Sequence, residues 1–392
     1  MVYRRKIYEK LKDHLQYRQI TVLTGMRRTG KTTLVMQLLD EIESKNKLYI
    51  DLENIDNQRL LSEENYDVIY RELMSQGFSK KEKMYIVIDE LQFVKNAPSV
   101  LKYLYDHHDI KFIVTGSSSY YLKNLFTESL AGRKAIFELF PLDFEEFLVF
   151  QDVFSKSESF ENARFNPYEY SRLKAHYEEF IRYGGFPEVV LTPMIPQKIR
   201  LLKDIVSAYI NVDVASLTDI QNKARLHDLI RMLASRVGTK LDYAKISRLL
   251  GVKRDTVVSY INFLEETYFI FRVPIITNDP DREIVKAKKM YLCDTGIANV
   301  LAELDSGAQF ENTAFHQLLG RGEIAYYSLK TGNEIDFILN RELALEAKES
   351  PTAQERKSLA NLAKKAGIAK SRLIGRHAVP NFDDYIWGGD IR

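Results

Sequence analysis

A glycine-rich turn between an apolar strand and a helix constrains this chain more than any other feature. Residues 21–39 read TVLTGMRRTGKTTLVMQLL, in which β-branched residues precede the turn and apolar residues recur at helical spacing after it. The turn fits the pattern G-x-x-x-x-G-K-[ST], with Gly25, Gly30, Lys31 and Thr32 at its fixed positions. Successive backbone N–H groups and the positive end of the helix then point at one place and attract phosphate oxygens. The stretch therefore predicts a loop that binds a nucleoside triphosphate.

Two side chains of this loop have separate expected roles. Lys31 is expected to reach the β- and γ-phosphates as a point charge, and the Thr32 hydroxyl to complete the shell of a Mg²⁺ ion. ATP and Mg²⁺ are therefore the expected cofactors. The predicted nucleotide contacts run through the loop into the first helical turn, namely Gly25, Met26, Arg27, Arg28, Thr29, Gly30, Lys31, Thr32 and Thr33.

Length and composition limit the classes of protein to consider. The 392 residues predict two or three domains, and 56 basic residues nearly cancel 54 acidic ones, so any nucleic-acid contact must come from a local patch. The single cysteine, Cys293, excludes internal disulfides and multi-cysteine metal sites. The opening MVYRRKIYEK lacks an apolar signal segment, and no apolar run approaches the roughly 18 to 20 residues of a membrane helix. We therefore expect a cytoplasmic protein without a membrane partner.

Apolar strands alternate with helical segments in the first region, which is expected to form one domain over residues 1–196. Such alternation predicts a mainly parallel sheet covered by helices on both faces, the α/β class. The expected strands are 20–23, 47–52, 84–88, 112–115 and 135–139, with a helix at 120–130.

Polar residues stand at the ends of these strands, and an open parallel sheet binds its ligands at the carboxyl ends. Asp89 and Glu90 end the stretch MYIVIDE, and we expect Asp89 to hold Mg²⁺ through water and Glu90 to deprotonate the attacking water. Ser117 is the hydroxyl expected to sense the γ-phosphate. Arg133 is expected either as a finger on a neighbouring subunit's nucleotide or as a solvated helix cap. A homo-oligomer is thus one expected arrangement.

These motifs resemble those of the AAA-superfamily P-loop ATPases, specifically a prokaryotic group with the loop G-x-R-R-x-G-K-T followed by D-E-[LI]-Q and T-G-S-S. They are residues 25–32, 89–92 and 115–118 here, and residues 130–133 and the turn 184–187 are also similar to that group. The resemblance implies ATP hydrolysis and places the 184–187 turn near the nucleotide. No second sensor arginine stands in a lid helix, so a switch-like or monomeric ATPase stays open beside a ring.

A tighter helical unit follows in the middle region, residues 197–280. The pattern predicts a winged helix-turn-helix. Its parts are a helix over 244–250, a turn at 251–252, a second helix over 254–267 and a strand over 268–276. The second helix and the following lysines are expected to form an exposed surface for DNA. This surface comprises Lys253, Arg254, Asp255, Thr256, Ser259, Tyr260, Lys286, Lys288 and Lys289. Salt-sensitive phosphate contact is one interpretation, and a lid or protein-contact module is the other.

The last region, residues 281–392, contains a hairpin whose register follows from its alternation. Apolar residues alternate along 334–339 and along 343–348. Matching the two apolar faces pairs Leu339 with Leu343 across a three-residue loop.

That register brings charged side chains together. It sets Asp336 opposite Glu346, with Lys348 on the same face. The two carboxylates are expected to bind Mg²⁺, while Lys348 steadies a developing oxyanion or orients water. The region resembles the PD-(D/E)xK nuclease fold, which implies that Glu311 on the preceding helix also serves the metal. It is also similar to the C-terminal domain that usually follows this ATPase group, and nuclease-like domains can keep the fold without cleaving.

These predictions describe an α/β protein with a parallel-sheet P-loop ATPase core, a helical and winged-helix middle and a C-terminal α/β nuclease-like domain. The expected function is ATP hydrolysis that drives or gates a DNA-associated activity, with a Mg²⁺-dependent nuclease site in the last region. The alternative is a signalling or regulatory switch in which ATP occupancy controls partner binding and the C-terminal site is vestigial.

Overall fold

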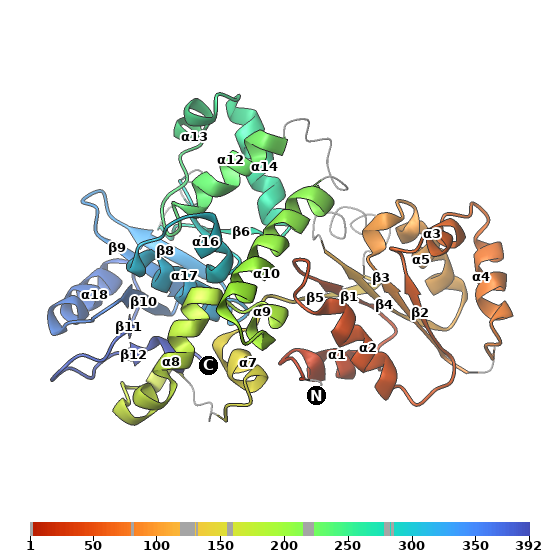
Figure 1. Cartoon of the computed structure of the whole chain (residues 1–392), viewed down its shortest axis with the longest axis horizontal. Helices are drawn as coiled ribbons and strands as arrows, with labels where there is room; N and C mark the ends of the chain where they lie inside the picture. The colour runs from red at the N-terminus through yellow and green to blue at the C-terminus, as the bar shows by residue number, and fades with distance from the viewer. Residues whose placement is uncertain are drawn as a thin grey trace. The chain divides into compact units, whose positions relative to one another are not determined.

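The computed structural model describes residues 3–79, 82–117, 130, 132–154, 160–214, 223–277, 283 and 286–392. The chain forms two compact units (Figure 1). The N-terminal unit comprises Met1–Phe140 with Glu266–Tyr268, and the C-terminal unit comprises Pro141–Glu265 with Phe269–Arg392. The helix expected at 120–130 lies, apart from its last residue, outside the described residues. Among the helices described, none combines the length and the apolar character that a membrane span needs.

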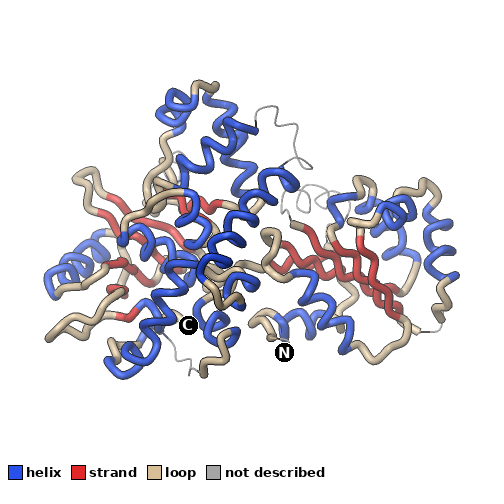
Figure 2. Tube along the Cα trace, viewed as in Figure 1, coloured by secondary structure: helices blue, strands red, loops and turns tan. Residues whose placement is uncertain are grey.

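The N-terminal unit is built on a five-stranded sheet in which every pairing is parallel. Its strands stand in the order β2-β3-β4-β1-β5, so β4 lies between β1 and β3. Figure 2 draws the strands in red and the helices in blue. They are β1 (Ile20–Thr24), β2 (Lys47–Asp51), β3 (Met84–Asp89), β4 (Ile110–Gly116) and β5 (Lys134–Glu138). Each corresponds to a predicted strand, because strands buried on both faces are marked by apolar runs. The parallel α/β core is confirmed.

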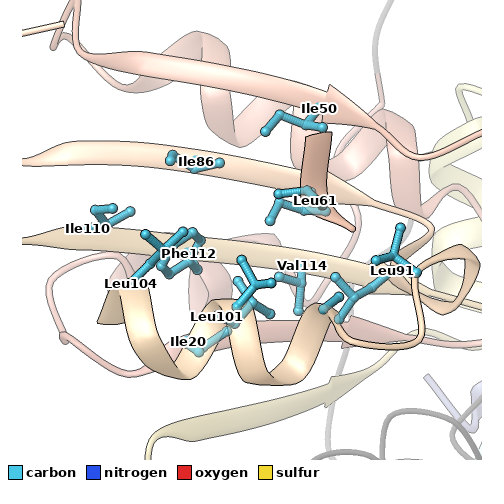
Figure 3. Close-up of a cluster of buried hydrophobic side chains, with 14 of the residues drawn as sticks. Ile20, Ile50, Leu61, Ile86, Leu91, Leu101, Leu104, Ile110, Phe112 and Val114 are labelled. Carbon is cyan, nitrogen blue, oxygen red and sulfur yellow. The ribbon is translucent and has the colours of Figure 1, made fainter. Parts of the chain in front are cut away.

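Helices bury this sheet between two apolar layers. Neighbouring residues of β3 enter opposite layers, since Ile86 packs in one hydrophobic cluster and Val87 in the other. Figure 3 shows the first cluster, in which Leu101 and Leu104 lie beside Phe112 of β4. The described helices of this unit are α1 (Tyr8–His14), α2 (Lys31–Glu41), α3 (Ile55–Leu61), α4 (Tyr66–Ser75) and α5 (Ala97–His107).

The C-terminal unit contains a five-stranded mixed sheet in the order β12-β11-β10-β9-β8. The strands are β8 (Ile324–Ser328), β9 (Glu334–Leu339), β10 (Leu343–Lys348), β11 (Lys370–Gly375) and β12 (Ile386–Trp387). In the hairpin of β9 and β10, Leu343 pairs with Leu339, which confirms the predicted register. A slip of one residue would turn the apolar face of the hairpin away from the core.

Helices α17 and α18 pack against this sheet, and the other described α-helices of the unit precede it in the sequence. The described α-helices of the unit are α7 (Phe144–Phe150), α8 (Pro167–Tyr183), α9 (Pro187–Leu191), α10 (Ile195–Ala208), α12 (Lys223–Ala234), α13 (Tyr243–Leu250), α14 (Arg254–Glu266), α16 (Thr295–Leu301), α17 (Ser306–Leu318) and α18 (Ala353–Lys365). After α14 the chain forms an antiparallel ribbon of β6 (Ile270–Val273) and β7 (Lys289–Leu292). Two helices, a turn and a two-stranded ribbon thus follow one another between Tyr243 and Leu292, and the second strand of the ribbon lies beyond the predicted end of the middle region.

The two compact units divide the chain at another place than the predicted domain limits, which stay predictions. The sequence pattern places limits at residues 196 and 280, whereas the structure groups the chain from Pro141 onward with the C-terminal sheet. Tyr177 of α8 explains this grouping, since its hydroxyl donates to Gln317 Oε1 over 2.8 Å and its ring lies 5.3 Å from that of Trp387. Such contacts join residues far apart in the sequence, which composition does not show.

Candidate nucleotide site and a second carboxylate cluster

The phosphate loop joins β1 to α2, and two glycines shape it. Gly25 and Gly30 have φ angles of 156° and 94°, a backbone region that residues with a side chain rarely adopt. A Cβ on Gly25 would clash with the backbone oxygen of Leu139, so the loop lies against the chain that follows β5. Only glycine permits this approach.

Lys31 turns back across the loop. Its Nζ donates to the carbonyl oxygens of Gly25 and Met26 over 3.0 and 3.1 Å, and the residue is 4% exposed. Arg5, which no motif predicted, donates from Nη1 to the backbone oxygen of Thr29 over 2.8 Å. The loop is therefore held by an ammonium on one side and a guanidinium on the other. Of the remaining predicted contacts, the structure buries Met26 and Thr29 and exposes Arg28, Thr32 and Thr33.

Hydroxyl groups from three other elements converge on Asp89. Its Oδ2 accepts from the hydroxyls of Thr32 and Tyr49 over 2.7 and 2.8 Å, and its Oδ1 accepts from the Thr115 hydroxyl. Asp89 is 3% exposed. Burial, reinforced by the hydrogen bond to Asp89, raises the pKa of Tyr49 far above its usual range, so Tyr49 remains a donor. A threonine hydroxyl beside a carboxylate supplies the oxygen ligands that Mg²⁺ prefers, so these residues fit the expected metal.

Glu90 follows in a strained backbone conformation, with φ 55° and ψ 52°. Its N–H donates to the Thr115 hydroxyl over 3.0 Å. The Gln92 amide donates to the Glu90 carboxylate and, over 3.0 Å, to Ser117 Oγ. Within the described residues, Gln92 Oε1 is buried without a hydrogen-bond partner. Gln92 therefore links the expected base to the expected γ-phosphate sensor.

Three residues of this site had no predicted role of their own. Thr115 and Gln92 belong to the T-G-S-S and D-E-L-Q motifs, so the motifs contained the signal. Tyr49 lies inside a strand, and only the pairing of β2 with β3 brings it to Asp89. Ser118, the last residue of T-G-S-S, lies outside the described residues.

Arg133 is paired within its own chain. Its Nε lies 2.8 Å from Asp106 Oδ1, and its Nη2 lies 3.1 Å from Asp106 Oδ2. The two side chains are 34% and 32% exposed. An arginine finger would have to exchange this two-point bond for phosphate oxygens of a neighbouring subunit.

The glycine turn at 184–187 packs inside the C-terminal unit. Gly185 N–H donates to Asp294 Oδ2 over 2.7 Å, and a Cβ on Gly184 would clash with the same carboxylate. Burial raises the pKa of Asp294 to about 6. The turn therefore has a structural role at Asp294, while its position relative to a nucleotide stays a prediction.

Helices α13 and α14 present basic side chains to solvent. Lys245 and Arg248 of α13 are exposed, as are Lys253 and Arg254 at the start of α14. Gly251, with φ 64°, ends α13 in the left-handed conformation and turns the chain toward α14. A local positive patch thus exists on a chain whose net charge is only +2.

Two of the side chains predicted for the exposed surface are buried, so these predictions were wrong. Tyr260 is 8% exposed because it follows the buried Val257 by three positions and shares its inward face of α14. Lys289 is 1% exposed because it lies in β7 against the C-terminal sheet. Ser259 and Lys286 are exposed as predicted.

Lys289 lies among acidic side chains. Its Nζ is 2.9 Å from Glu334 Oε1, 3.0 Å from Asp336 Oδ1 and 3.3 Å from Glu311 Oε1. Burial alone would lower the pKa of Lys289, but the charges of Asp336, Glu311 and Glu334 outweigh it and raise that pKa far above its usual range. The ammonium is therefore charged at neutral pH. Sequence reasoning missed both Lys289 and Glu334 as members of this cluster.

Glu346 and Lys348 form a pair beside these groups. Lys348 Nζ lies 2.9 Å from Glu346 Oε1, and Ala347 N–H donates to Asp336 Oδ2 over 3.1 Å. Burial, with the Asp336 charge, raises the pKa of Glu346 to about 7. Burial and Asp336 likewise raise the pKa of Glu311 to about 7. The structure thus brings the four predicted nuclease-like residues into one neighbourhood.

A Mg²⁺ ion does not fit this cluster as it is arranged. Mg²⁺ takes near-octahedral oxygen ligands at about 2.0–2.1 Å. Here the Lys289 ammonium contacts the Asp336 and Glu311 oxygens, and Glu346 is tied to Lys348. In the part of the chain that the structure describes, no three His, Cys, Asp or Glu side chains are placed to hold a metal ion. The arrangement differs from the predicted metal site because a buried lysine enters it.

Known protein families provide a match for the N-terminal unit. Residues 17–148 match the family model of an AAA domain. Over these residues, which are called the AAA domain below, the chain is similar to that family. The match contains the phosphate loop, Asp89 and Glu90, so it covers the site described above. Residues 174–308 match a domain of unknown function.

Relatives in other organisms are similar over most of the chain. A Haemophilus influenzae protein is 28% identical over 340 residues, covering 82% of this chain and 80% of its own length. A Methanocaldococcus jannaschii protein is 28% identical over 340 residues, covering 83% and 74%. A Mycobacterium tuberculosis protein is 25% identical over 408 residues, covering 98% and 83%. All three are described as uncharacterized proteins.

Two solved structures are similar at lower identity. A Walker-type ATPase of Pyrococcus abyssi is 16% identical with a TM-score of 0.47, covering 77% of this chain and 96% of its own. The Aeropyrum pernix ORC1 protein in complex with DNA is 13% identical with a TM-score of 0.34, covering 77% and 92%. Since both TM-scores are below 0.5, the assignment of the AAA domain rests on the family model and the geometry of the loop.

Proposed function

We propose that this chain hydrolyses ATP in its AAA domain. The main support is the position of Asp89, because the Thr32 hydroxyl at the end of the phosphate loop lies 2.7 Å from its carboxylate. A phosphate loop, a hydroxyl and carboxylate pair for Mg²⁺, and a glutamate beside them are the parts that ATP hydrolysis requires.

In the proposed reaction the side chains bind the phosphates and move one proton. Thr32 and, through water, Asp89 would hold Mg²⁺, which when bound neutralises charge on the β- and γ-phosphates. Lys31 exchanges its two carbonyl partners for phosphate oxygens. Glu90 takes the proton of the attacking water, and ADP and phosphate leave. Ser117, one amide away from Glu90, contacts the γ-phosphate or that water.

The proposal extends to DNA contact by α13 and α14. Their exposed basic side chains, Lys245, Arg248, Lys253 and Arg254, support it. Such residues bind phosphates, so the affinity would fall as salt rises and depend little on base sequence. A lid or protein-contact role for these helices is the alternative. A cytoplasmic location accords with the buried, free Cys293.

For the C-terminal cluster, the geometry favours the expectation of a nuclease-like domain that does not cleave. The observation behind this choice is the Lys289 ammonium, 3.0 Å from Asp336 Oδ1, where a nuclease would need a metal. ATP hydrolysis would then act as a switch on the DNA-contacting helices and not as the power source of a nuclease.

Turnover, DNA binding and plasmid nicking by the full chain test these parts separately. We expect Lys31→Ala to abolish turnover, DNA to change the wild-type rate, and Lys253→Ala with Arg254→Ala to reduce the salt dependence of DNA binding. No nicking is expected with Mg²⁺ or Mn²⁺. If Lys31→Ala still hydrolyses ATP, the proposed hydrolysis at the phosphate loop is refuted. If DNA does not change the rate of ATP hydrolysis, the proposed DNA contact is refuted. Nicking that Asp336→Asn removes would refute the non-cleaving domain.

A further inference from the structure

Two lysines from different segments meet at one carboxylate of the C-terminal unit. Lys289 Nζ lies 2.9 Å from Glu334 Oε1, and Lys240 Nζ lies 3.1 Å from Glu334 Oε2. The ring of Tyr326 lies 5.9 Å from the first ammonium and 5.6 Å from the second, within cation–π range. Lys240 precedes α13, Lys289 begins β7 and Glu334 begins β9. One carboxylate thus connects the helix-turn-helix segment, the ribbon and the sheet.

Backbone hydrogen bonds run beside these lysines. Gly238 N–H donates to the Met290 oxygen over 2.9 Å, and Met290 N–H donates to the Thr239 oxygen over 3.1 Å. After β6, Ile276 N–H donates to the Tyr326 oxygen over 2.7 Å. The segment before α13 therefore pairs with β7, and the segment after β6 pairs with β8. The helix-turn-helix is attached on both flanks near the lysine and carboxylate cluster.

We propose that Lys289 is a built-in cation that fills the cluster of Glu311, Glu334 and Asp336 and fastens the helix-turn-helix to the C-terminal sheet. The cluster is then a metal-free joint and not a divalent-metal centre. The inference rests on the proposed function only for the DNA-contacting role of α13 and α14. The cluster itself is independent of ATP hydrolysis.

The charges explain why an ammonium excludes a divalent metal here. Lys289 reaches three carboxylates at 2.9 to 3.3 Å. A divalent metal would need the same oxygens at shorter distances and would have to displace the ammonium. Without the ammonium, the buried Asp336 and the partly buried Glu311 and Glu334 would repel one another and bind a replacement cation. Lysine and metal therefore compete for one position.

Mn²⁺ binding to the nucleotide-free full chain tests whether the cluster of Glu311, Glu334 and Asp336 is free of metal. Electron paramagnetic resonance measures free Mn²⁺, and wild type and Asp336→Asn are expected to bind the same amount, because both have an unchanged AAA domain. Wild-type binding that Asp336→Asn removes would overturn the proposal. If the wild type does not hydrolyse ATP, the proposed function is refuted, but the comparison of Mn²⁺ binding between wild type and Asp336→Asn still holds.

Lys289→Met tests the joint, since it keeps an apolar stem and removes the charge. We expect the unfolding temperature of the C-terminal unit to fall by roughly 5–15 °C, DNA binding to weaken, and Mn²⁺ to raise the unfolding temperature of this variant but not of the wild type. Lys286→Met is the matched control, because Lys286 is exposed three positions earlier, and its unfolding temperature should stay at the wild-type value. A Lys289→Met protein that unfolds like this control would overturn the joint. If Lys289→Met does not fold, the comparison of wild type with Asp336→Asn decides.

Discussion

The chain holds its two clusters of acidic side chains in opposite ways. In the AAA domain, Asp89 accepts hydrogen bonds from the hydroxyls of Thr32, Tyr49 and Thr115. In the C-terminal unit, the Lys289 ammonium contacts three carboxylates. Hydroxyls orient a carboxylate and leave its charge in place, whereas an ammonium neutralises it. The Asp89 carboxylate therefore keeps its negative charge for a metal, whereas the Lys289 ammonium offsets negative charge in the C-terminal cluster.

Carboxylates at the right spacing therefore do not by themselves define a metal site. Asp336, Glu346 and Lys348 have the expected register, and Asp89 and Glu90 have the expected place at the end of β3. What separates the clusters is the charge of the groups packed against them. Substitutions in either cluster test this contrast.

Glu90→Gln should retain ATP binding and lose turnover by about 10²–10⁴-fold, because an amide cannot take the proton of the attacking water. Phosphate release and equilibrium ATP binding measure the two properties. Glu64→Gln, an exposed glutamate of the same domain, is the control and should leave both unchanged. If Glu90→Gln hydrolyses ATP at the wild-type rate, Glu90 is not the base that takes the proton of the attacking water.

Glu311→Gln should reduce the pH dependence of stability in the lysine-filled cluster. The folded-state pKa of Glu311 is raised from 4.5 to about 7, so the folded protein keeps a proton that the unfolded chain releases. The free energy of unfolding therefore falls as pH rises from 4.5 through about 7. The variant should avoid part of this fall, on the order of 1–3 kcal/mol above neutral pH.

Chemical denaturation of the C-terminal unit at about pH 5 and about pH 8 measures this difference. Glu342→Gln, at an exposed turn of the same sheet, is the control, and its free energy of unfolding should fall with pH as that of the wild type does. If the free energy of unfolding of Glu311→Gln falls by the same amount, the raised pKa of Glu311 is contradicted.

Gln92→Ala should lower turnover about tenfold, the effect of losing one hydrogen bond to a charged group. The Gln92 amide donates to the Glu90 carboxylate, so its loss removes one contact that orients the expected base. Phosphate release measures the rate, and the exposed Glu64→Gln should keep the wild-type value. An unchanged rate in Gln92→Ala would reduce Gln92 to a packing role.

Arg133→Ala should have the smallest effect, because the pair with Asp106 is about one-third exposed and such pairs contribute about 0–1 kcal/mol to stability. Turnover should match that of Asp106→Ala. A finger acting on a neighbouring subunit would instead cost about 10³-fold or more. Mixing Arg133→Ala with Lys31→Ala subunits would then restore activity, and that result would require a homo-oligomer.

Much of the fold and of the first site follows from short-range patterns. The phosphate loop depends on glycine spacing, and the five strands of the AAA domain are marked by apolar runs. The pairing of Leu339 with Leu343 follows from strand alternation, since side chains repeat every second residue. The position of Tyr49 beside Asp89 depends on the pairing of β2 with β3, and no local pattern contains it.

An ATPase-like loop, a carboxylate pair after β3 and an acidic hairpin with Lys348 can be recognised from the sequence alone, because each depends on residues close together in the chain. The contact of Lys289 with that hairpin appears in the folded chain and in no local pattern. Among Lys286, Lys288 and Lys289, the pattern predicts a solvated basic face. The packing of β7 against α17 and β9 instead buries the third lysine, and the three carboxylates beside its ammonium offset the cost of burying that charge.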